Sequence, residues 1–88
     1  MEENTLARFE SISGKHWAEL DFIDTEKFGR IYGYKGHQCM GGYEVGTTEA
    51  DALAQLAAKV AAGHFQPDAN KIPLRLVYTV PGLKLDAE

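Results

Sequence analysis

One segment of the chain combines a helix start, a helical apolar stripe and a helix stop. Thr48 is a good N-cap residue, and Glu49 and Asp51 place negative charge at the positive end of the helix dipole. Gly63 suits the position just after a helix. Between these signals, apolar side chains recur at the i, i+3, i+4, i+7 spacing of one buried stripe, at Leu53, Leu56, Ala57 and Val60. The pattern predicts one helix over about residues 49–62, which needs a second layer to cover its stripe.

The other segments alternate between apolar and polar residues with the period of two that is typical of β-strands. In the clearest of them, Ala18, Leu20 and Phe22 share one face. Turn residues such as Ser13-Gly14 separate the segments. The expected strands cover residues 5–12, 15–23, 28–34 and 37–45 before the helix and 73–80 after it, and residues 83–85 are a candidate for one more short strand.

These elements predict an α+β fold in the order β-β-β-β-α-β. Short turns make the first four strands an antiparallel meander, and the helix then crosses one face and returns a last strand to the sheet. We expect an antiparallel sheet of four to five strands packed on one main helix, as a two-layer sandwich. The helical stripe is expected to pack on the apolar face of the second strand, at Ala18, Leu20 and Phe22.

The chain length suits one domain and is too short for two. It has 88 residues, of which 44% are hydrophobic and 25% are charged, as in ordinary globular domains. This composition excludes disorder for the middle of the chain. We therefore expect a single domain over residues 1–88, with frayed termini at residues 1–4 and 86–88.

Cysteine usage and the first residues indicate a cytoplasmic protein. The single cysteine, Cys39, cannot form an internal disulfide, which fits a reducing compartment. The start, Met1-Glu2-Glu3-Asn4, lacks the basic residues and the apolar run of a signal peptide. No apolar stretch approaches the roughly 20 residues of a membrane-spanning helix. We therefore expect no membrane association.

The junction before the predicted helix resembles one found in HicB-like antitoxin domains. The residues concerned run Gly46-Thr47-Thr48-Glu49-Ala50-Asp51-Ala52. Those domains likewise pass from a small sheet into an alanine-rich helix after a Gly-x-Thr turn. The resemblance consists mostly of N-cap residues, which any helix can use, so we assign no family from it.

Several residues and the net charge bear on catalysis, metal binding and nucleic-acid binding. His37 and Cys39 lie two apart on an expected strand, where a thiol beside an imidazole can become a nucleophile, but no third residue orients them. Three histidines and Cys39 match a zinc site by number and not by spacing, since His16, His37 and His64 fall on different segments. The net charge of −4 disfavours direct binding to nucleic acid. The sequence thus predicts a protein that is not an enzyme and has no cofactor or metal.

Aromatic and acidic side chains on the expected sheet favour a protein-binding role. Trp17, Glu19 and Asp21 share the polar side of the second strand, where a large aromatic flanked by carboxylates suits an interface anchor. A second candidate surface is aromatic and comprises Tyr32, Tyr34 and Tyr43. The acidic charge favours a protein partner with a basic surface, and the pattern leaves open which of the two faces binds it.

The first hypothesis is therefore a small, acidic, non-catalytic protein-binding module. Small acidic domains that inhibit host proteins are common in phages and other mobile elements, and nucleic-acid-binding effectors are among their targets, so an inhibitor is a narrower form of this hypothesis. The alternative is a small-molecule or cation-binding domain that uses the glycine- and tyrosine-rich sheet, and the third is an enzyme that uses His37 and Cys39. A homodimer is compatible with each of them.

Overall fold

The computed structural model of the chain describes residues 3–37, 41–65 and 72–85. Over these residues it contains four strands and one helix. In chain order they are β1 (Thr5–Glu10), β2 (Trp17–Thr25), β3 (Gly29–Gly36), α1 (Glu49–Ala61) and β4 (Arg75–Thr79). Within this part of the chain, no helix has the length and apolar character that a membrane crossing needs.

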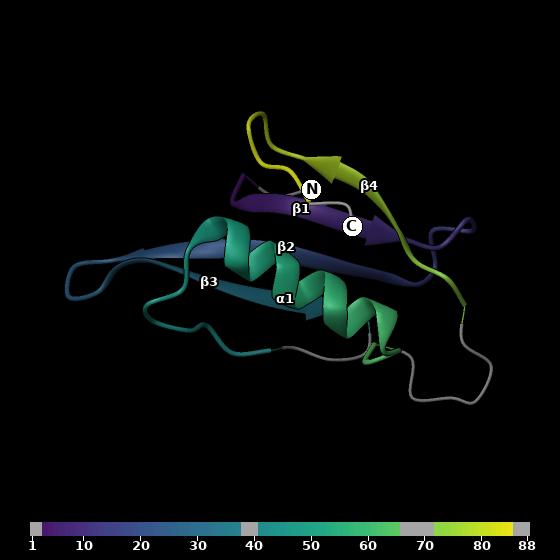
Figure 1. Cartoon of the computed structure of the whole chain (residues 1–88), viewed down its shortest axis with the longest axis horizontal. Coiled ribbons are helices and arrows are strands. Elements are labelled where there is room, and N and C mark those ends of the chain that lie inside the picture. Colours follow the sequence, from purple (N-terminus) through teal and green to yellow (C-terminus); the bar gives the residue numbers. More distant parts are fainter. Residues whose placement is uncertain (1–2, 38–40, 66–71, 86–88) are drawn as a thin grey trace.

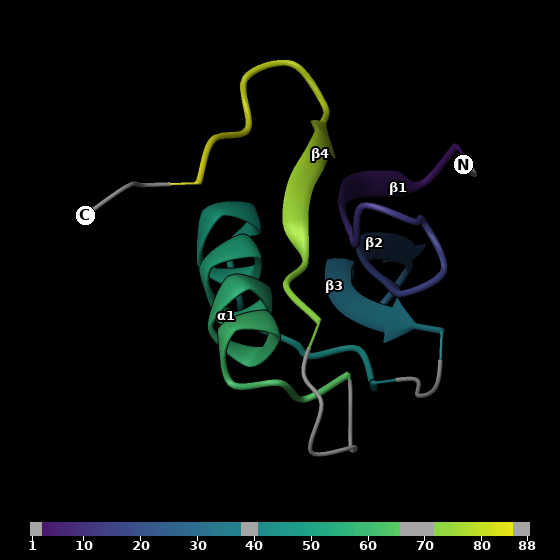
Figure 2. The same ribbon diagram turned by 90° about the vertical axis from the view of Figure 1, so that its right-hand side faces the viewer.

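The four strands form one antiparallel sheet with the order β3-β2-β1-β4. The helix lies along one face of this sheet, where it contacts β2 and β3 (Figures 1 and 2). The predicted α+β class, antiparallel pairing and two-layer arrangement are confirmed. The described sheet has four strands, the lower of the two numbers, four and five, that the sequence predicts.

The core forms where the helix meets the sheet. Leu53 and Leu56 are buried, with 0% and 1% of their surface exposed, in one cluster with Ala18 and Leu20 of β2. The side chains of β1 and the loop after α1 complete the cluster, and Phe65 is 1% exposed. The predicted helical stripe and its partner face on β2 are therefore confirmed.

The helix ends are close to those that the sequence predicts. The Thr48 Oγ1 atom accepts a hydrogen bond from the backbone N–H of Asp51 at 3.1 Å, which caps the first turn. At the other end Gly63 adopts a φ of 77°, a left-handed conformation that glycine takes without the strain of a Cβ atom. Because both caps are local, residue types alone could place this element.

The segment before the helix differs from the prediction of a strand over residues 37–45. Residues 38–40 lie outside the described part of the chain, and the described remainder forms one isolated bridge, between Glu44 and Tyr32. The N–H groups of Gly41 and Glu44 donate to the carbonyls of Tyr34 and Tyr32 at 2.9 and 3.0 Å, so the segment still follows the edge of β3. Glycines at 41, 42 and 46 weaken extended structure here. The candidate strand at residues 83–85 is also not formed, although Leu83 is buried in the core.

Candidate functional site

The sheet has a second face, directed away from α1, which we call the outer face. Side chains alternate along a strand, and Ala18 and Leu20 of β2 point into the core. Trp17, Glu19 and Asp21 therefore point to the outer face, as the sequence predicts. No helix or strand within residues 3–37, 41–65 and 72–85 covers this face, so its side chains form a surface of the molecule.

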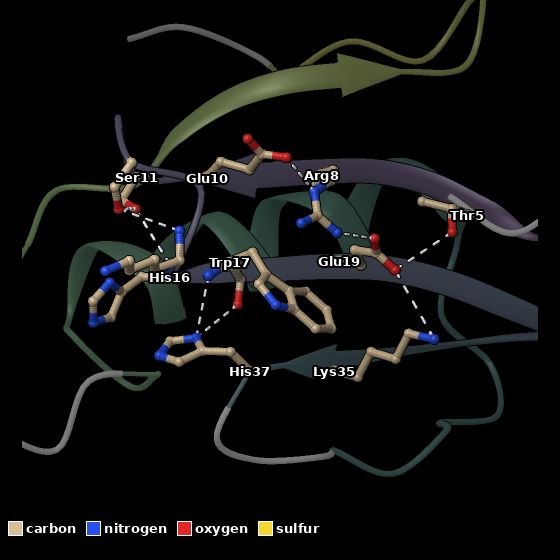
Figure 3. A network of polar contacts seen from close by, with 11 residues as sticks. Thr5, Arg8, Glu10, Ser11, His16, Trp17, Glu19, Lys35 and His37 are labelled. Atoms are coloured by element: carbon tan, nitrogen blue, oxygen red, sulfur yellow. Dashed lines mark hydrogen bonds and ion pairs between the residues drawn. The ribbon is translucent and has the colours of Figure 1, made fainter.

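An ion-pair network lies in the middle of the outer face (Figure 3). Arg8 of β1 stands opposite Glu19 of β2, and its guanidinium group contacts the carboxylates of both Glu19 and Glu10. The Lys35 Nζ atom lies 4.0 Å from the Glu19 Oε1 atom, and the Thr5 Oγ1 atom lies 3.5 Å from the same oxygen. Burial lowers the pKa of the Arg8 guanidinium, but the hydrogen bonds to Glu10 and Glu19 outweigh it, so the pKa lies above its ordinary value.

The expectation of exposed carboxylates on this face is wrong. Glu19 is 4% exposed and Asp21 is 3% exposed. The long side chains of Arg8 and Lys35, the cross-strand neighbours of Glu19, lie next to its carboxylate. Asp21 pairs instead with Thr5 and Gly33, and the Tyr43 ring lies beside Gly33. Glu19 in particular lies between two cations, Arg8 and Lys35, so this part of the sheet does not present a patch of free negative charge.

Trp17 keeps part of its surface open at one end of this network. The Arg8 Cζ atom lies 4.7 Å from the centroid of the Trp17 ring, within the range of a cation–π interaction. Arg8 thus links the aromatic ring to the buried carboxylate of Glu19. The indole is half-buried and lies on the opposite side of the sheet from the helix, so it is available to a partner.

Next to Arg8, the outer face is hollowed between β1 and β4. The hollow is lined by Arg8, Glu10, Val77 and Tyr78. Tyr78 pairs with Arg8 and Leu76 pairs with Phe9, so Val77 is an extra residue that makes a bulge in β4, and it is 48% exposed. Sequence reasoning missed this part of the surface, because regular alternation keeps Tyr78 on the same side as Leu76, and the bulge moves it to the outer face beside Arg8.

The three tyrosines of the second predicted surface do not lie together. Tyr32 and Tyr34 of β3 point to the helix side, where they pack against the core cluster. A Cβ atom on Gly33, which pairs with Asp21, would come within 2.6 Å of the Tyr43 ring, so this ring lies on the outer face. The prediction of one aromatic surface is wrong, because Tyr32 and Tyr34 share the helix side of β3 and the Tyr43 ring lies on the other side.

A small hollow between β3 and α1 bears on the alternative of ligand binding. Tyr32, Gly33, Tyr34 and Gln55 are among the residues that line it. Its volume of about 20 Å³ is space for about one water molecule. Pockets for small organic ligands have volumes of roughly 300–1,000 Å³. The glycine- and tyrosine-rich part of the sheet therefore does not enclose a ligand-sized cavity among the described residues.

The structure describes the histidines considered for catalysis and metal binding, but not the cysteine. Cys39 lies outside the described residues, so the His37–Cys39 pair is not described. His64 contacts Tyr34 and Phe65 just after the helix. Within the described ranges, no group of three or more His, Cys, Asp or Glu side chains is arranged to hold a metal ion.

A second ion pair lies at the β2–β3 hairpin, and it changes the pKa of one of its members. The Nε and Nη2 atoms of Arg30 donate to the two carboxylate oxygens of Asp24 at 2.8 and 3.2 Å. This hydrogen bonding lowers the pKa of the Asp24 carboxyl below its ordinary value of 3.8. Both side chains are largely exposed, at 44% and 64%, so the pair adds little to stability at neutral pH.

We expect an NMR titration to find a low pKa for Asp24, and Arg30→Gln to return it to the ordinary aspartate range. The folded-state pKa is below the unfolded one, so the stabilisation is complete above the unfolded pKa and disappears as the pH falls through the folded pKa. An Asp24 titration that Arg30→Gln leaves unchanged would show that the pair does not form in solution.

Comparison of the chain with protein-family models, with curated proteins and with solved structures finds no match. The function of the chain is therefore inferred from the geometry of the outer face.

Proposed function

We propose that this chain is a non-catalytic protein-binding module that docks its partner on the outer face of the sheet. The observation that carries the proposal is the group formed by the half-buried Trp17, the Arg8 guanidinium on its ring and the adjoining hollow. Tryptophan, tyrosine and arginine are the residues most enriched among binding hot spots. Here Trp17, Arg8 and Tyr78 come from three neighbouring strands and share one open face.

The charges on this face bear on the kind of partner. Arg8 and Lys35 offset the carboxylates of Glu10 and Glu19, so the docking surface is close to neutral. The net charge of −4 therefore acts mainly from other parts of the chain, where it can steer a basic partner toward the molecule without direct pairing at the centre. An inhibitor of a host protein, such as a nucleic-acid-binding effector in a phage setting, is the narrower form of this proposal and rests on composition alone.

A photo-crosslinking amino acid at position 78 tests for a partner on this face. We expect it to capture one protein in the cell of origin, because Tyr78 lines the hollow beside Arg8. The same amino acid at Ala58, which is exposed on α1, is the control and should not capture that protein. Capture from Ala58 and not from position 78 would place the binding surface on the helix and contradict the proposal.

With the partner in hand, Trp17→Ala is expected to weaken binding by at least about 2 kcal/mol, or roughly 30-fold in Kd, as for a hot-spot aromatic. The variant should stay folded, because the indole is half-buried and does not contribute to the core cluster beneath α1. Isothermal titration calorimetry measures the affinity, and a thermal melt measures the folding.

Ile23→Ala is the matched control for this variant. Ile23 lies on the same strand and the same face, and it is 40% exposed, but it is at the opposite end from Arg8. It should leave the affinity almost unchanged. If Trp17→Ala keeps the parental affinity, or melts as low as a core variant, then Trp17 is a structural residue and not an anchor.

A further inference from the structure

The structure brings two histidines from different segments into contact at one end of the sheet. His16 ends the turn between β1 and β2, and His37 follows β3 directly (Figure 3). The centroids of the two rings are 4.7 Å apart and the ring planes are at 78°. Backbone contacts hold both residues in place, since the His16 carbonyl accepts from Ser11 at 2.9 Å and the His37 N–H donates to the Trp17 carbonyl at 3.2 Å.

Each of these rings has one nitrogen that the fold buries without a hydrogen bond. The atoms are the His16 Nδ1 and the His37 Nε2, neither of which has a partner among the described residues. Buried polar atoms almost always have a partner, and a bound water or ion is one way to supply it. The two nitrogens belong to imidazole rings that are in contact, so one bound species could be the partner of both.

The other nitrogen of His37 is already held by the main chain. The backbone N–H of Trp17 donates to the His37 Nδ1 atom at 3.1 Å, and the Trp17 carbonyl oxygen lies 3.2 Å from the same atom. Metal-binding histidines typically donate one ring N–H to a backbone carbonyl or a carboxylate, which orients the ring and leaves the other nitrogen free to bind. A metal on the Nε2 atom would select the tautomer with the proton on Nδ1, in which that proton is directed at the Trp17 carbonyl in place of the contact with the Trp17 N–H.

The geometry points to a binding site for a transition-metal dication formed by His16 and His37. Imidazole nitrogens suit Cu²⁺, Ni²⁺ and Zn²⁺, and they suit Mg²⁺ and Ca²⁺ poorly. Two protein ligands leave the other coordination positions to water, and Cu²⁺ should bind more tightly than Zn²⁺. The rings are now almost perpendicular, and His16 lies in a turn, where its side chain can rotate to bring a nitrogen toward the metal. This inference is independent of the docking surface.

Titration of the purified chain with CuCl₂ and ZnCl₂ tests the site. Trp17 is the only tryptophan, and its main chain contacts His37, so its fluorescence reports binding. We expect saturable quenching by one Cu²⁺ per chain, and weaker binding of Zn²⁺ in competition. His16→Ala and His37→Ala should each weaken binding at least about tenfold, because the loss of a residue that only orients a metal ligand already costs about 10–100-fold. His64→Ala, which changes an exposed histidine elsewhere, is the matched control and should bind as the parent does.

NMR of the parent chain keeps the inference testable even if a variant does not fold. On addition of ZnCl₂, the ring signals of His16 and His37 should shift together, and those of His64 should not. The absence of saturable binding would overturn the inference. So would a titration in which only His64 shifts, or binding that Cys39→Ser removes and His16→Ala preserves.

Discussion

Leu56→Ala is expected to lower the free energy of unfolding by about 2–5 kcal/mol, the usual range for a leucine removed from a core. The side chain is 1% exposed and packs in one cluster with Leu53, Ala18 and Leu20, so its removal leaves a cavity between helix and sheet. Domains of this size have a total stability of about 5–15 kcal/mol, so the loss is a large fraction of the total. Urea denaturation, followed by far-UV circular dichroism, measures it.

Gln55→Ala is the matched control, because Gln55 is the preceding residue of the same helix and is exposed. Alanine is at least as good a helix former as glutamine, so this variant should unfold close to the parental midpoint. If Leu56→Ala also unfolded at the parental midpoint, the helix would present a different face to the sheet.

The second large effect is expected for Arg8→Met, at about 2–3 kcal/mol of destabilisation. Removing one partner of a buried ion pair costs about 3–5 kcal/mol, because the remaining charge stays buried. The Glu19 side chain is 5% exposed, so its carboxylate would stay buried without its main partner. The cost is reduced because Lys35 stays within 4.0 Å of the same carboxylate. Methionine keeps much of the bulk that the arginine stem contributes.

Two further variants separate the charge effect from the loss of packing. The double variant Arg8→Met with Glu19→Leu should recover much of the loss, because it leaves no buried charge without its main partner. Arg30→Met removes the exposed partner of Asp24 and should shift the midpoint only slightly. Equal destabilisation by Arg8→Met and Arg30→Met would show that the buried network contributes no more than a surface pair.

The burial of Glu19 also decides which variants can test binding. Charge reversals at Glu19 and Asp21 are natural tests if these residues form an exposed acidic rim. With 4% and 3% of their surface exposed, both reversals would be expected to disturb folding first. Loss of binding in such variants would therefore carry no information about the interface. Trp17 and Tyr78 are the better positions, because both are only half-buried.

The sequence by itself determined the helix and the side of β2 that faces the core. The helix could be located because its signals are local: Thr48 caps it, Gly63 ends it, and Leu53 and Leu56 repeat with the helical period. Alternation along β2 likewise separated Ala18 and Leu20 from Trp17 and Glu19. These properties depend on residues that are neighbours along the chain, so they can be predicted without the fold.

Only the tertiary structure decided which residues meet across the strands. The pairing of Arg8 with Glu19, and thus the burial of the predicted acidic face, depends on the register between β1 and β2. The position of Tyr78 on the outer face depends on a bulge in β4, and the contact between His16 and His37 requires that residues next to β2 and β3 meet at one end of the sheet. Register and bulges are set by the packing of the whole sheet on the helix, and a shift of one residue exchanges the two faces. For this reason the candidate site emerged from the fold, although each of its residues was visible in the sequence.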